Sequence, residues 1–585
     1  MRKIFYSFTI AFAILSVSVT VAANKTTVLS DADKKIVQKF LDEWDSQYDA
    51  AEKMLTETIT GWQYHMDAAS GTVHGTRASF YYADALFDVG GKENTQRALD
   101  IIDRVIDLQD TVATSLSRGV FPYFLEEPLA TKKSPIDYNW ADFNGALLLD
   151  IYITHRDEIP VNIRAKMKDA IILTADAIKR RNVAPDYTNI ALMGTYVTYM
   201  SSVLFDLPDM HDYALKKLDV FYNYTLAKKG FSEYNSPTYT ITALTELERM
   251  KRHFPDSDVK VKIDSLYSIG WDVIARHYHA SSAQWTGPNS RSYSSFVHPS
   301  FYGLLNNASN GKIDLGYTFE QSDMKVKHRI PDYLLGYFIQ PHYPRTEVDT
   351  FENNPPQVIG TSYMADAYAI STANRSSLWN QRRPLLAYWG SKETPCYMQL
   401  RFLHDFYDFS SAMFYGVQRE NSVLACINLE TNGCDKHIWL SPIKDGKVDA
   451  TDFRLRFEFG NCPDMSAVEL PENANAPFEF ELNGLQFHIR LFISQFDSMK
   501  GHWEKGGDEK TGWIDFVIYA GDNRQFDLNA LKSAVWGLSL KVGDKLKKQD
   551  KTHPKFGIKN GTLNVKENGL KISVPVKPHK RESNI

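Results

Sequence analysis

The spacing of apolar residues changes from a helical period to a strand period near residue 360. Before this point, from about residue 29 to 336, apolar residues recur at i, i+3 and i+4, as they do in residues 99–106. After it, residues 453–459 and 478–489 alternate strictly between apolar and polar side chains. The second of these stretches contains Asn-Gly, the commonest signal of a tight hairpin turn. The chain is therefore expected to fold as a helical part followed by a β-rich part.

The length of 585 residues is enough for two or more domains. Many helices joined by short loops, without a legible repeat, favour a toroid of helical hairpins over a regular solenoid. Short strands with tight turns favour an antiparallel β-sandwich. The predicted fold class is thus an N-terminal (α/α) toroid, or incomplete barrel, followed by a C-terminal β-sandwich. The expected divisions are a signal peptide at 1–23, a helical domain at 24–340, a Pro-rich linker at 341–360 and the sandwich at 361–585.

The N-terminus has the pattern of a secretory signal. Met1-Arg2-Lys3 precedes an apolar run that ends at small residues, Val21-Ala22-Ala23. The mature chain is expected to be exported, either periplasmic or secreted, with no membrane insertion after signal cleavage. The net charge of −5 argues against a nucleic-acid protein, which would carry a basic stripe.

Cysteine and histidine spacing gives no metal or redox signal. The four cysteines do not have the spacing of a zinc ribbon or a redox pair, and no His-rich ligand pattern is present. We therefore expect no metal and no cofactor. The four are Cys396, Cys426, Cys434 and Cys462.

Three segments combine amide, carboxylate, cationic and aromatic side chains beyond what a connecting loop requires. They are residues 186–189, 230–239 and 285–293. Aromatic residues make up 13% of the chain, which suits stacking on pyranose rings and equally suits large cores. We interpret the three segments as the walls of one saccharide-binding cleft.

The order of Asn189, the segment from Gly230 to Tyr239, and Arg291, on a predicted helical toroid followed by a sandwich, resembles the α/α-toroid polysaccharide lyases. These include the chondroitin AC and hyaluronate lyases, the alginate lyases and the heparinase II/III-like enzymes. The resemblance implies β-elimination at the 4-linkage of a uronic-acid-containing glycan, leaving a 4,5-unsaturated uronate. Those families have a His in the middle segment, where this chain has Tyr234 or Asn235, so the general base stays open.

Elimination requires three kinds of group, and the resemblance assigns residues to each. An amide, Asn189, neutralises the uronate carboxylate as charge develops, supported by Arg291. Tyr239 or Tyr293 exchanges the proton, which requires a nearby positive charge because a free Tyr has a pKa of about 10. Asn189 could instead be a helix N-cap, Tyr239 a buried aromatic and Arg291 a structural ion-pair partner. The predicted substrate-binding residues are Asn139, Trp140, Glu233, Tyr234, Asn235, Trp285, Asn289 and His298.

Two other functions compete with a lyase acting on an acidic polysaccharide or oligosaccharide. A glycoside hydrolase would need two carboxylates across the bond, for which Glu233, Asp142 and Asp186 are available. A non-catalytic glycan-binding protein would use the same aromatic residues and release no product. The product distinguishes the three, because only a lyase leaves a conjugated double bond that absorbs ultraviolet light.

Overall fold

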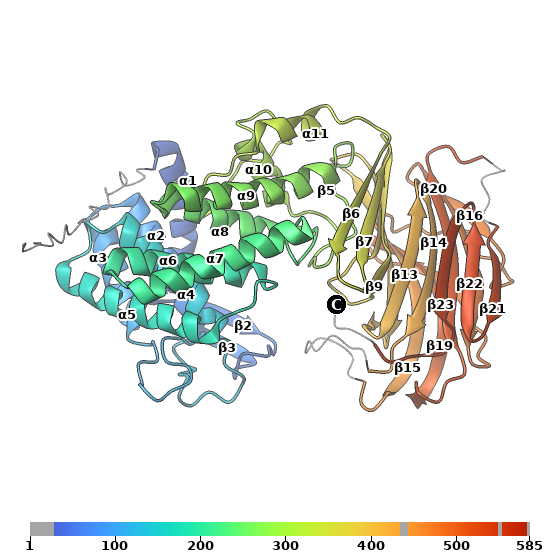
Figure 1. Cartoon of the computed structure of the whole chain (residues 1–585), viewed down its shortest axis with the longest axis horizontal. Coiled ribbons are helices and arrows are strands. Elements are labelled where there is room, and N and C mark those ends of the chain that lie inside the picture. Colours follow the sequence, from blue (N-terminus) through green and yellow to red (C-terminus); the bar gives the residue numbers. More distant parts are fainter. Residues whose placement is uncertain (1–28, 433–442, 548–552, 582–585) are drawn as a thin grey trace, which may run out of the picture.

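The computed structural model describes residues 29–432, 443–547 and 553–581 (Figure 1). The expected signal peptide at 1–23 and Cys434 lie outside these residues. Within them, a helical half is followed by a half built of antiparallel sheets, which confirms the predicted fold class. No helix in this described part is long and apolar enough to cross a bilayer.

Four helical hairpins form a two-layered arc, an incomplete (α/α) toroid. Each hairpin contributes one inner and one outer helix, and consecutive inner helices pack against one another. The inner helices are α2 (Thr76–Val89), α4 (Asn139–Thr154), α6 (Thr188–Phe205) and α8 (Tyr239–His253). The outer helices are α3 (Lys92–Ile106), α5 (Val161–Arg181), α7 (Pro208–Lys228) and α9 (Ser257–His277). Because each inner helix follows an outer one, the N-terminal ends of all four inner helices lie at the same side of the arc.

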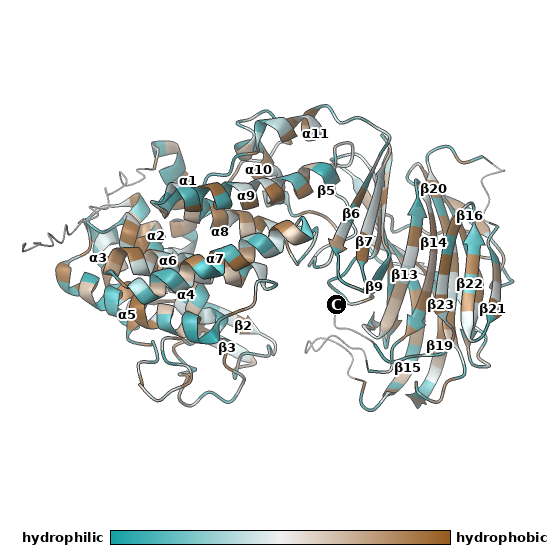
Figure 2. Ribbon diagram, in the orientation of Figure 1, coloured by the Kyte–Doolittle hydropathy of each residue, from teal (hydrophilic) through white to brown (hydrophobic). Residues whose placement is uncertain are grey.

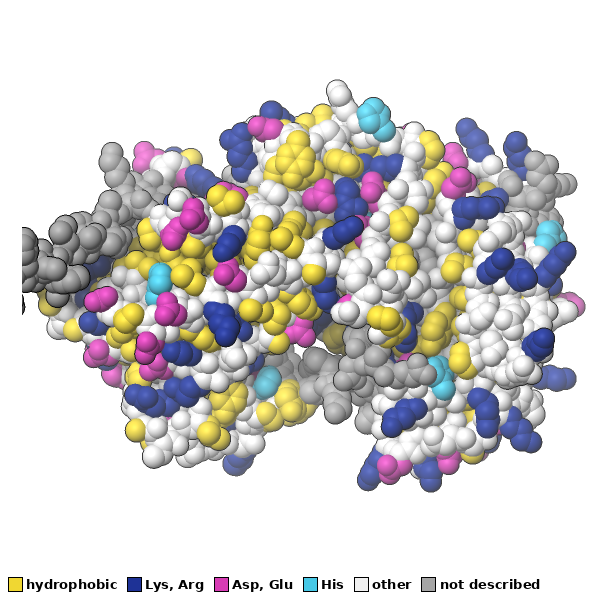
Figure 3. All heavy atoms as spheres, viewed as in Figure 1, with side chains coloured by type: hydrophobic (Ala, Val, Ile, Leu, Met, Phe, Trp, Pro, Cys, Tyr) yellow, Lys and Arg dark blue, Asp and Glu magenta, His cyan; other side chains and the backbone are white. Residues whose placement is uncertain are grey.

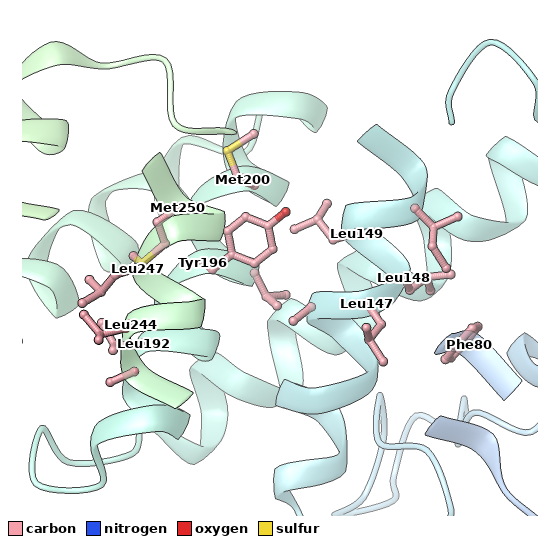
Figure 4. Packing of buried hydrophobic residues seen from close by; sticks show 14 of the residues in the cluster. Phe80, Leu147, Leu148, Leu149, Leu192, Tyr196, Met200, Leu244, Leu247 and Met250 are labelled. Atoms are coloured by element: carbon pink, nitrogen blue, oxygen red, sulfur yellow. The ribbon is translucent and has the colours of Figure 1, made fainter. Parts of the chain in front are cut away.

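Burial explains which helices are inner. Every residue of α6 from Thr188 to Ser202 is buried, as expected for a helix that has neighbours on all sides. Thr195, Thr198 and Ser201 donate their hydroxyl groups to backbone carbonyls one turn earlier, as Thr198 does to Gly194 at 2.7 Å. Figure 4 shows side chains of α4, α6 and α8 meeting in this core, with Tyr196 at the centre.

Three further helices extend the arc at its two ends, and a small sheet precedes it. The helices are α1 (Asp31–Trp44), which packs on α2, α10 (Pro299–Ala308) and α11 (Leu335–Ile339). The small sheet has the order β1 (Tyr48–Asp49), β2 (Met54–Thr60) and β3 (Ser70–His74). This sheet falls in a region for which the sequence predicts helix. A two-stranded ladder, β4 (Tyr278–His279) and β5 (Gln284–Trp285), follows α9.

The sandwich has two large sheets and a third, smaller one. The first large sheet contains β6 (Arg345–Glu352), β7 (Val358–Met364), β8 (Tyr368–Ala373), β10 (Leu385–Gly390), β11 (Pro395–His404), β12 (Tyr407–Asp408), β15 (Lys447–Gly460), β18 (His502–Gly507) and β19 (Thr511–Asp527). The second contains β9 (Arg375–Ser377), β13 (Ala412–Arg419), β14 (Ser422–Leu429), β16 (Phe478–Leu482), β17 (Leu485–Phe496) and β20 (Ala534–Gly543). The third contains β21 (Lys555–Lys559), β22 (Thr562–Glu567) and β23 (Leu570–Pro575), and it covers β13 and β14.

Apolar side chains fill both spaces between the sheets. Figure 2 shows hydrophobic and hydrophilic segments interleaved along the strands, as expected where alternate residues face a core. The hairpin predicted at 478–489 is β16–β17, with Asn483 at a positive φ of 46° in its turn. Cys396, Cys426 and Cys462 are buried free thiols.

The segment 341–360 is not the linker that its prolines predict. It contains β6 and the first residues of β7, at the edge of the first large sheet. The prolines at 341, 344, 355 and 356 flank β6 and do not interrupt it. Proline is compatible with strand ends at a sheet edge, so its density here marks the limits of a strand.

Candidate active site

Two loops of the helical domain are locked together by buried amides. Asn235, in the loop between α7 and α8, has a positive φ of 43° and donates to the carbonyls of Thr286 at 2.8 Å and Pro288 at 3.0 Å. Its side-chain oxygen accepts from the indole of Trp285, and its backbone carbonyl accepts from Asn289 at 2.7 Å. Asn235, Trp285 and Asn289 are buried. The protein itself uses the polar groups of these three side chains, so their role in binding substrate stays a prediction.

Tyr234 and His298 are also occupied within the protein. The Tyr234 ring stacks on Phe351 of β6 with centroids 4.1 Å apart, which ties the loop to the sandwich. His298 caps α10 by accepting from the backbone N–H of Ser300 at 3.2 Å. His298 also lines a cavity of about 300 Å³, together with Tyr293. Of these two predicted contacts, only His298 keeps a position from which it could touch a ligand.

Arg291 is the centre of a cluster that both domains build. Its guanidinium donates to Glu233 Oε1 at 3.1 Å and to Gln381 Oε1 at 3.0 Å from both Nε and Nη2. The same group lies over the ring of Tyr239, 4.5 Å from the centroid. Contacts on three sides fix the plane of the guanidinium, so its charge has a defined direction.

Tyr239 and Tyr293 form a hydroxyl pair beside this cation. Their oxygens are 2.8 Å apart, and Tyr293 is 61% exposed. Burial raises the pKa of the Tyr239 hydroxyl above its usual value; Arg291 opposes the shift, and Tyr293 and Glu233 add to it. Tyr239 is therefore protonated near neutral pH, as a proton donor must be.

The Glu233 carboxyl, unlike the Tyr239 hydroxyl, can lose its proton near neutral pH. Burial raises the pKa of its carboxyl from 4.5 to about 7; the Arg291 charge lowers it and the Asp186 charge raises it. Its second oxygen, Oε2, is buried and has no hydrogen-bond partner among the described residues. A carboxyl that titrates near neutrality and has one unused oxygen is suited to accept and release a proton.

The N-terminal ends of α4 and α6 carry the predicted amides. Asn189 is the second residue of α6 and is buried, and Tyr187 occupies the N-cap position, so the N-cap alternative for Asn189 is wrong. The Oδ1 atoms of Asn189 and Asn139 are buried without a partner in the described part of the chain. Asn139 donates to the Tyr187 hydroxyl at 3.0 Å. Unpaired amide oxygens accept hydrogen bonds and so suit the hydroxyl groups of a ligand, while the positive ends of the two helices suit a carboxylate on it.

The remaining predicted residues lie farther back or at the edge. Trp140, at the start of α4, is half-buried and stacks on Tyr123 with centroids 3.7 Å apart. Asp142 is buried beside Arg181 at 3.4 Å, and burial raises the pKa of its carboxyl to about 8. Asp186 is exposed. Asp142 is thus enclosed between helices, where it could not face a water across a glycosidic bond.

One group of the described residues has the composition of a metal site. Asp84, Asp88 and His155 are buried and offer ligand atoms within 4.8 Å of one another. The ammonium of Lys325 lies among them, 2.8 Å from Asp84 and 2.5 Å from Asp88. The lysine supplies the positive charge that these carboxylates require, so the group is a buried ion cluster of the scaffold.

Sequence reasoning missed the contribution of the sandwich. Gln381 and Trp379 lie in the loop between β9 and β10, and Trp379 has its ring 5.4 Å from the Arg291 guanidinium. Asn289 pairs with Arg383 of the same loop through both backbone groups. The only sequence signal was a short polar and aromatic run, 376–383, which lies some ninety residues from Arg291.

Comparison with known proteins places the helical domain in a family. The family model described as "Domain of unknown function (DUF8769)" matches residues 34–336, more than half of the chain. The chain belongs to this family. No curated protein matches it.

Several solved structures are similar to the DUF8769 chain over most of its length. Heparinase III is 9% identical, with 96% of this chain and 93% of that chain covered and a TM-score of 0.47. A chondroitin AC lyase of Streptomyces coelicolor A3, in complex with chondroitin sulphate, is 9% identical, with 93% and 85% covered and a TM-score of 0.45. Endoglucanase CelQ from Clostridium thermocellum, complexed with cellotetraose, is 10% identical, with 89% and 94% covered and a TM-score of 0.27.

Proposed function

We propose that this protein is an exported polysaccharide lyase. It cleaves a glycan that contains uronic acid by β-elimination at the 4-linkage and leaves a 4,5-unsaturated uronate. The observation that carries the proposal is the arrangement around Arg291. A carboxyl with a pKa of about 7 lies on one side of the guanidinium, and a tyrosine hydroxyl that stays protonated lies on another.

The groups divide the elimination between them. Glu233 takes the proton from C5, and the electrons of that C–H bond form the C4–C5 double bond. The bond from C4 to the linking oxygen breaks, and that oxygen takes the proton of Tyr239. The hydroxyl of Tyr293, 2.8 Å from that of Tyr239 and exposed, returns a proton from solvent. Each acid–base contribution of this kind is worth roughly 10²–10⁴-fold in rate.

The uronate carboxylate must be neutralised because the C5 proton is only weakly acidic. Asn189 and Arg291 are the groups proposed for this, the first through the N–H donors of its side-chain amide near the N-terminal end of α6 and the second through its fixed charge. Both are held before substrate arrives, so their stabilisation of the developing charge costs no rearrangement in the reaction step. Asn139 would hold the same sugar through its own unused amide oxygen.

With Glu233 as the base, the reaction does not need the His that the lyase families have in the middle segment and this chain lacks. A tyrosine whose pKa is raised is a poor base near neutrality, whereas a carboxyl with a pKa of about 7 is half ionised there. The sequence predicts that Tyr239 or Tyr293 both removes and returns the proton. In the proposal Tyr239 only donates a proton, to the leaving oxygen.

A panel of uronate glycans tests the proposal. Incubation with the wild-type protein should give ultraviolet absorbance from the conjugated double bond with at least one of them. Glu233→Gln should abolish the signal, and Glu93→Gln, which alters an exposed carboxyl of α3, should retain it. New reducing ends without ultraviolet absorbance would contradict a lyase.

A glycoside hydrolase is the second candidate, because a raised carboxyl pKa is also what a hydrolase acid needs. Asp186 would be its second carboxylate, since its charge acts on Glu233 and it is exposed. In that case Asp186→Asn would be as damaging as Glu233→Gln, while Tyr239→Phe would retain activity. The lyase proposal predicts the reverse order for Asp186 and Tyr239.

Export is proposed on the sequence of residues 1–23 alone. N-terminal sequencing of the protein recovered from the cell exterior or periplasm should begin near Asn24. A protein that keeps Met1 in the cytosol would contradict export.

A further inference from the structure

The turn between β2 and β3 presents large aromatic side chains to solvent. Trp62 is 55% exposed and Tyr64 is 42% exposed. Exposed aromatic rings gathered on one projecting hairpin indicate a contact surface, since burial is the usual state of such side chains. In Figure 1 this hairpin lies at the lower edge of the helical half and points towards the sandwich.

The exposed rings continue into a chain of ring contacts. Tyr64 meets His65 edge to face at 4.8 Å, His65 meets Tyr123 at 6.2 Å, and Tyr123 stacks on Trp140 at 3.7 Å. We call Trp62, Tyr64, His65, Tyr123 and Trp140 the aromatic ridge. Apart from Trp62 and Tyr64, its members are half-buried, so part of each side chain is accessible to solvent.

Hydrogen bonds fix the inner members of the ridge in place. His65 Nδ1 lies 2.8 Å from the carbonyl oxygen of Pro135, and the Tyr123 hydroxyl donates to Asp137 at 2.6 Å. The indole of Trp140 donates to the Thr76 hydroxyl at 3.2 Å. Rings held in this way lose little conformational freedom when a ligand binds.

The ridge is continuous with the proposed active site. Asp137, which holds Tyr123, also accepts from the backbone N–H of Asn139 at 2.9 Å. Asn139 in turn donates to Tyr187, and burial, together with the charges of both Asp137 and Glu233, raises the pKa of the Tyr187 hydroxyl. The connection therefore runs along the N-terminal ends of α4 and α6, which are adjacent inner helices. Adjacent packed helices are about 8–10 Å apart, so the ridge lies beyond the space that a single sugar would fill.

We propose that the aromatic ridge binds pyranose rings of a long glycan whose reacting sugar lies at Glu233 and Tyr239. The apolar C–H faces of the sugars would stack on the rings, while hydroxyl groups at their edges would reach Asp137 and solvent. The identity of the ligand rests on the proposed function, because it is the same glycan. In Figure 3, yellow hydrophobic side chains lie on the surface of the lower right part of the helical half, where Figure 1 places β2 and β3. A surface of this kind selects long chains over short ones.

The first test measures binding and does not depend on turnover. Trp62→Ala combined with Tyr64→Ala is compared with Tyr333→Ala. Tyr333 is 69% exposed on the turn that precedes α11, at the opposite edge of the helical half. Retardation in native gels that contain an acidic polysaccharide, and calorimetry with a uronate hexasaccharide and disaccharide, give the affinities. The double variant should bind polymer and hexasaccharide at least roughly tenfold more weakly, with disaccharide unchanged. Tyr333→Ala should behave as wild type.

The second test separates this inference from the proposed chemistry. On polymer, the double variant should raise KM and leave kcat near the wild-type value, because the ridge touches no reacting atom. If the wild type binds glycans without cleaving any, and the double variant loses that binding, the ridge stands and the lyase proposal fails. If the double variant binds and cleaves long chains as well as wild type, the ridge proposal is wrong whatever the chemistry. Trp62→Ala alone repeats the comparison should the double variant fold poorly, and it should show the same loss in smaller degree.

Discussion

Glu233→Gln should change how the stability of the protein depends on pH. The Glu233 carboxyl has a pKa of about 7 in the folded protein against 4.5 in the unfolded chain. The folded state therefore holds this proton more tightly, so Glu233 contributes stability that is full below pH 4.5 and is lost as the pH rises through 7. Gln resembles the protonated carboxyl and cannot ionise, so the variant should not lose this stability as the pH rises.

The size of the effect follows from the shift. One pKa unit corresponds to about 1.4 kcal/mol, and integration between pH 5 and pH 8 gives a difference of about 2.5 kcal/mol between variant and wild type. If a helical domain of roughly 300 residues unfolds as a unit, this equals about 4 °C in Tm. Differential scanning calorimetry of both proteins at pH 5 and pH 8 measures it.

The stability of Glu233→Gln relative to wild type should therefore increase as the pH rises from 5 to 8. Glu93→Gln, which alters an exposed carboxyl, is the control and should follow the wild type at both pH values. If Glu233→Gln also follows the wild type, Glu233 does not titrate near neutrality. Its assignment as the base would then lose its physical ground.

Three substitutions at the site are expected to act on catalysis in different ways. Tyr239→Phe keeps the ring over Arg291 and removes the proton donor, so kcat should fall by roughly 10²–10⁴-fold; near-normal turnover would remove Tyr239 from the mechanism. Arg291→Lys should also lower kcat, since an ammonium cannot hold Glu233 and Gln381 in one plane; a rate within twofold of wild type would contradict this. The acid limb of the kcat profile should have its midpoint near pH 7. Asp186→Asn should move that limb to lower pH, because the Asp186 charge raises the pKa of Glu233; a limb that stays in place would show that another group controls it.

The order of the two folds could be predicted because it depends on local periodicity. The strict alternation in 453–459 becomes part of β15, and the hairpin at 478–489 becomes β16–β17. The density of prolines in 341–360 misled the prediction, since composition alone does not distinguish a linker from a strand with prolines at both ends.

The site was predictable only as a set of segments. The segments 230–239 and 285–293 do meet, but the sequence could not show which of their polar groups face inward. Asn235 and Trp285 are hydrogen-bonded to each other where the two loops meet. Glu233, only two residues earlier, instead pairs with Arg291. Gln381 could not be found, because its contact with Arg291 depends on how the two domains pack.

The identity of the bond-breaking step is the central claim, and the origin of the atoms in the product tests it most directly. A uronate polymer is digested in water enriched in heavy oxygen, and the products are weighed by mass spectrometry while their ultraviolet absorbance is recorded. Elimination predicts products that absorb ultraviolet light and contain no oxygen from water at the cleaved bond. Products that take up one heavy oxygen for each bond cleaved, and do not absorb, would show hydrolysis and contradict the account.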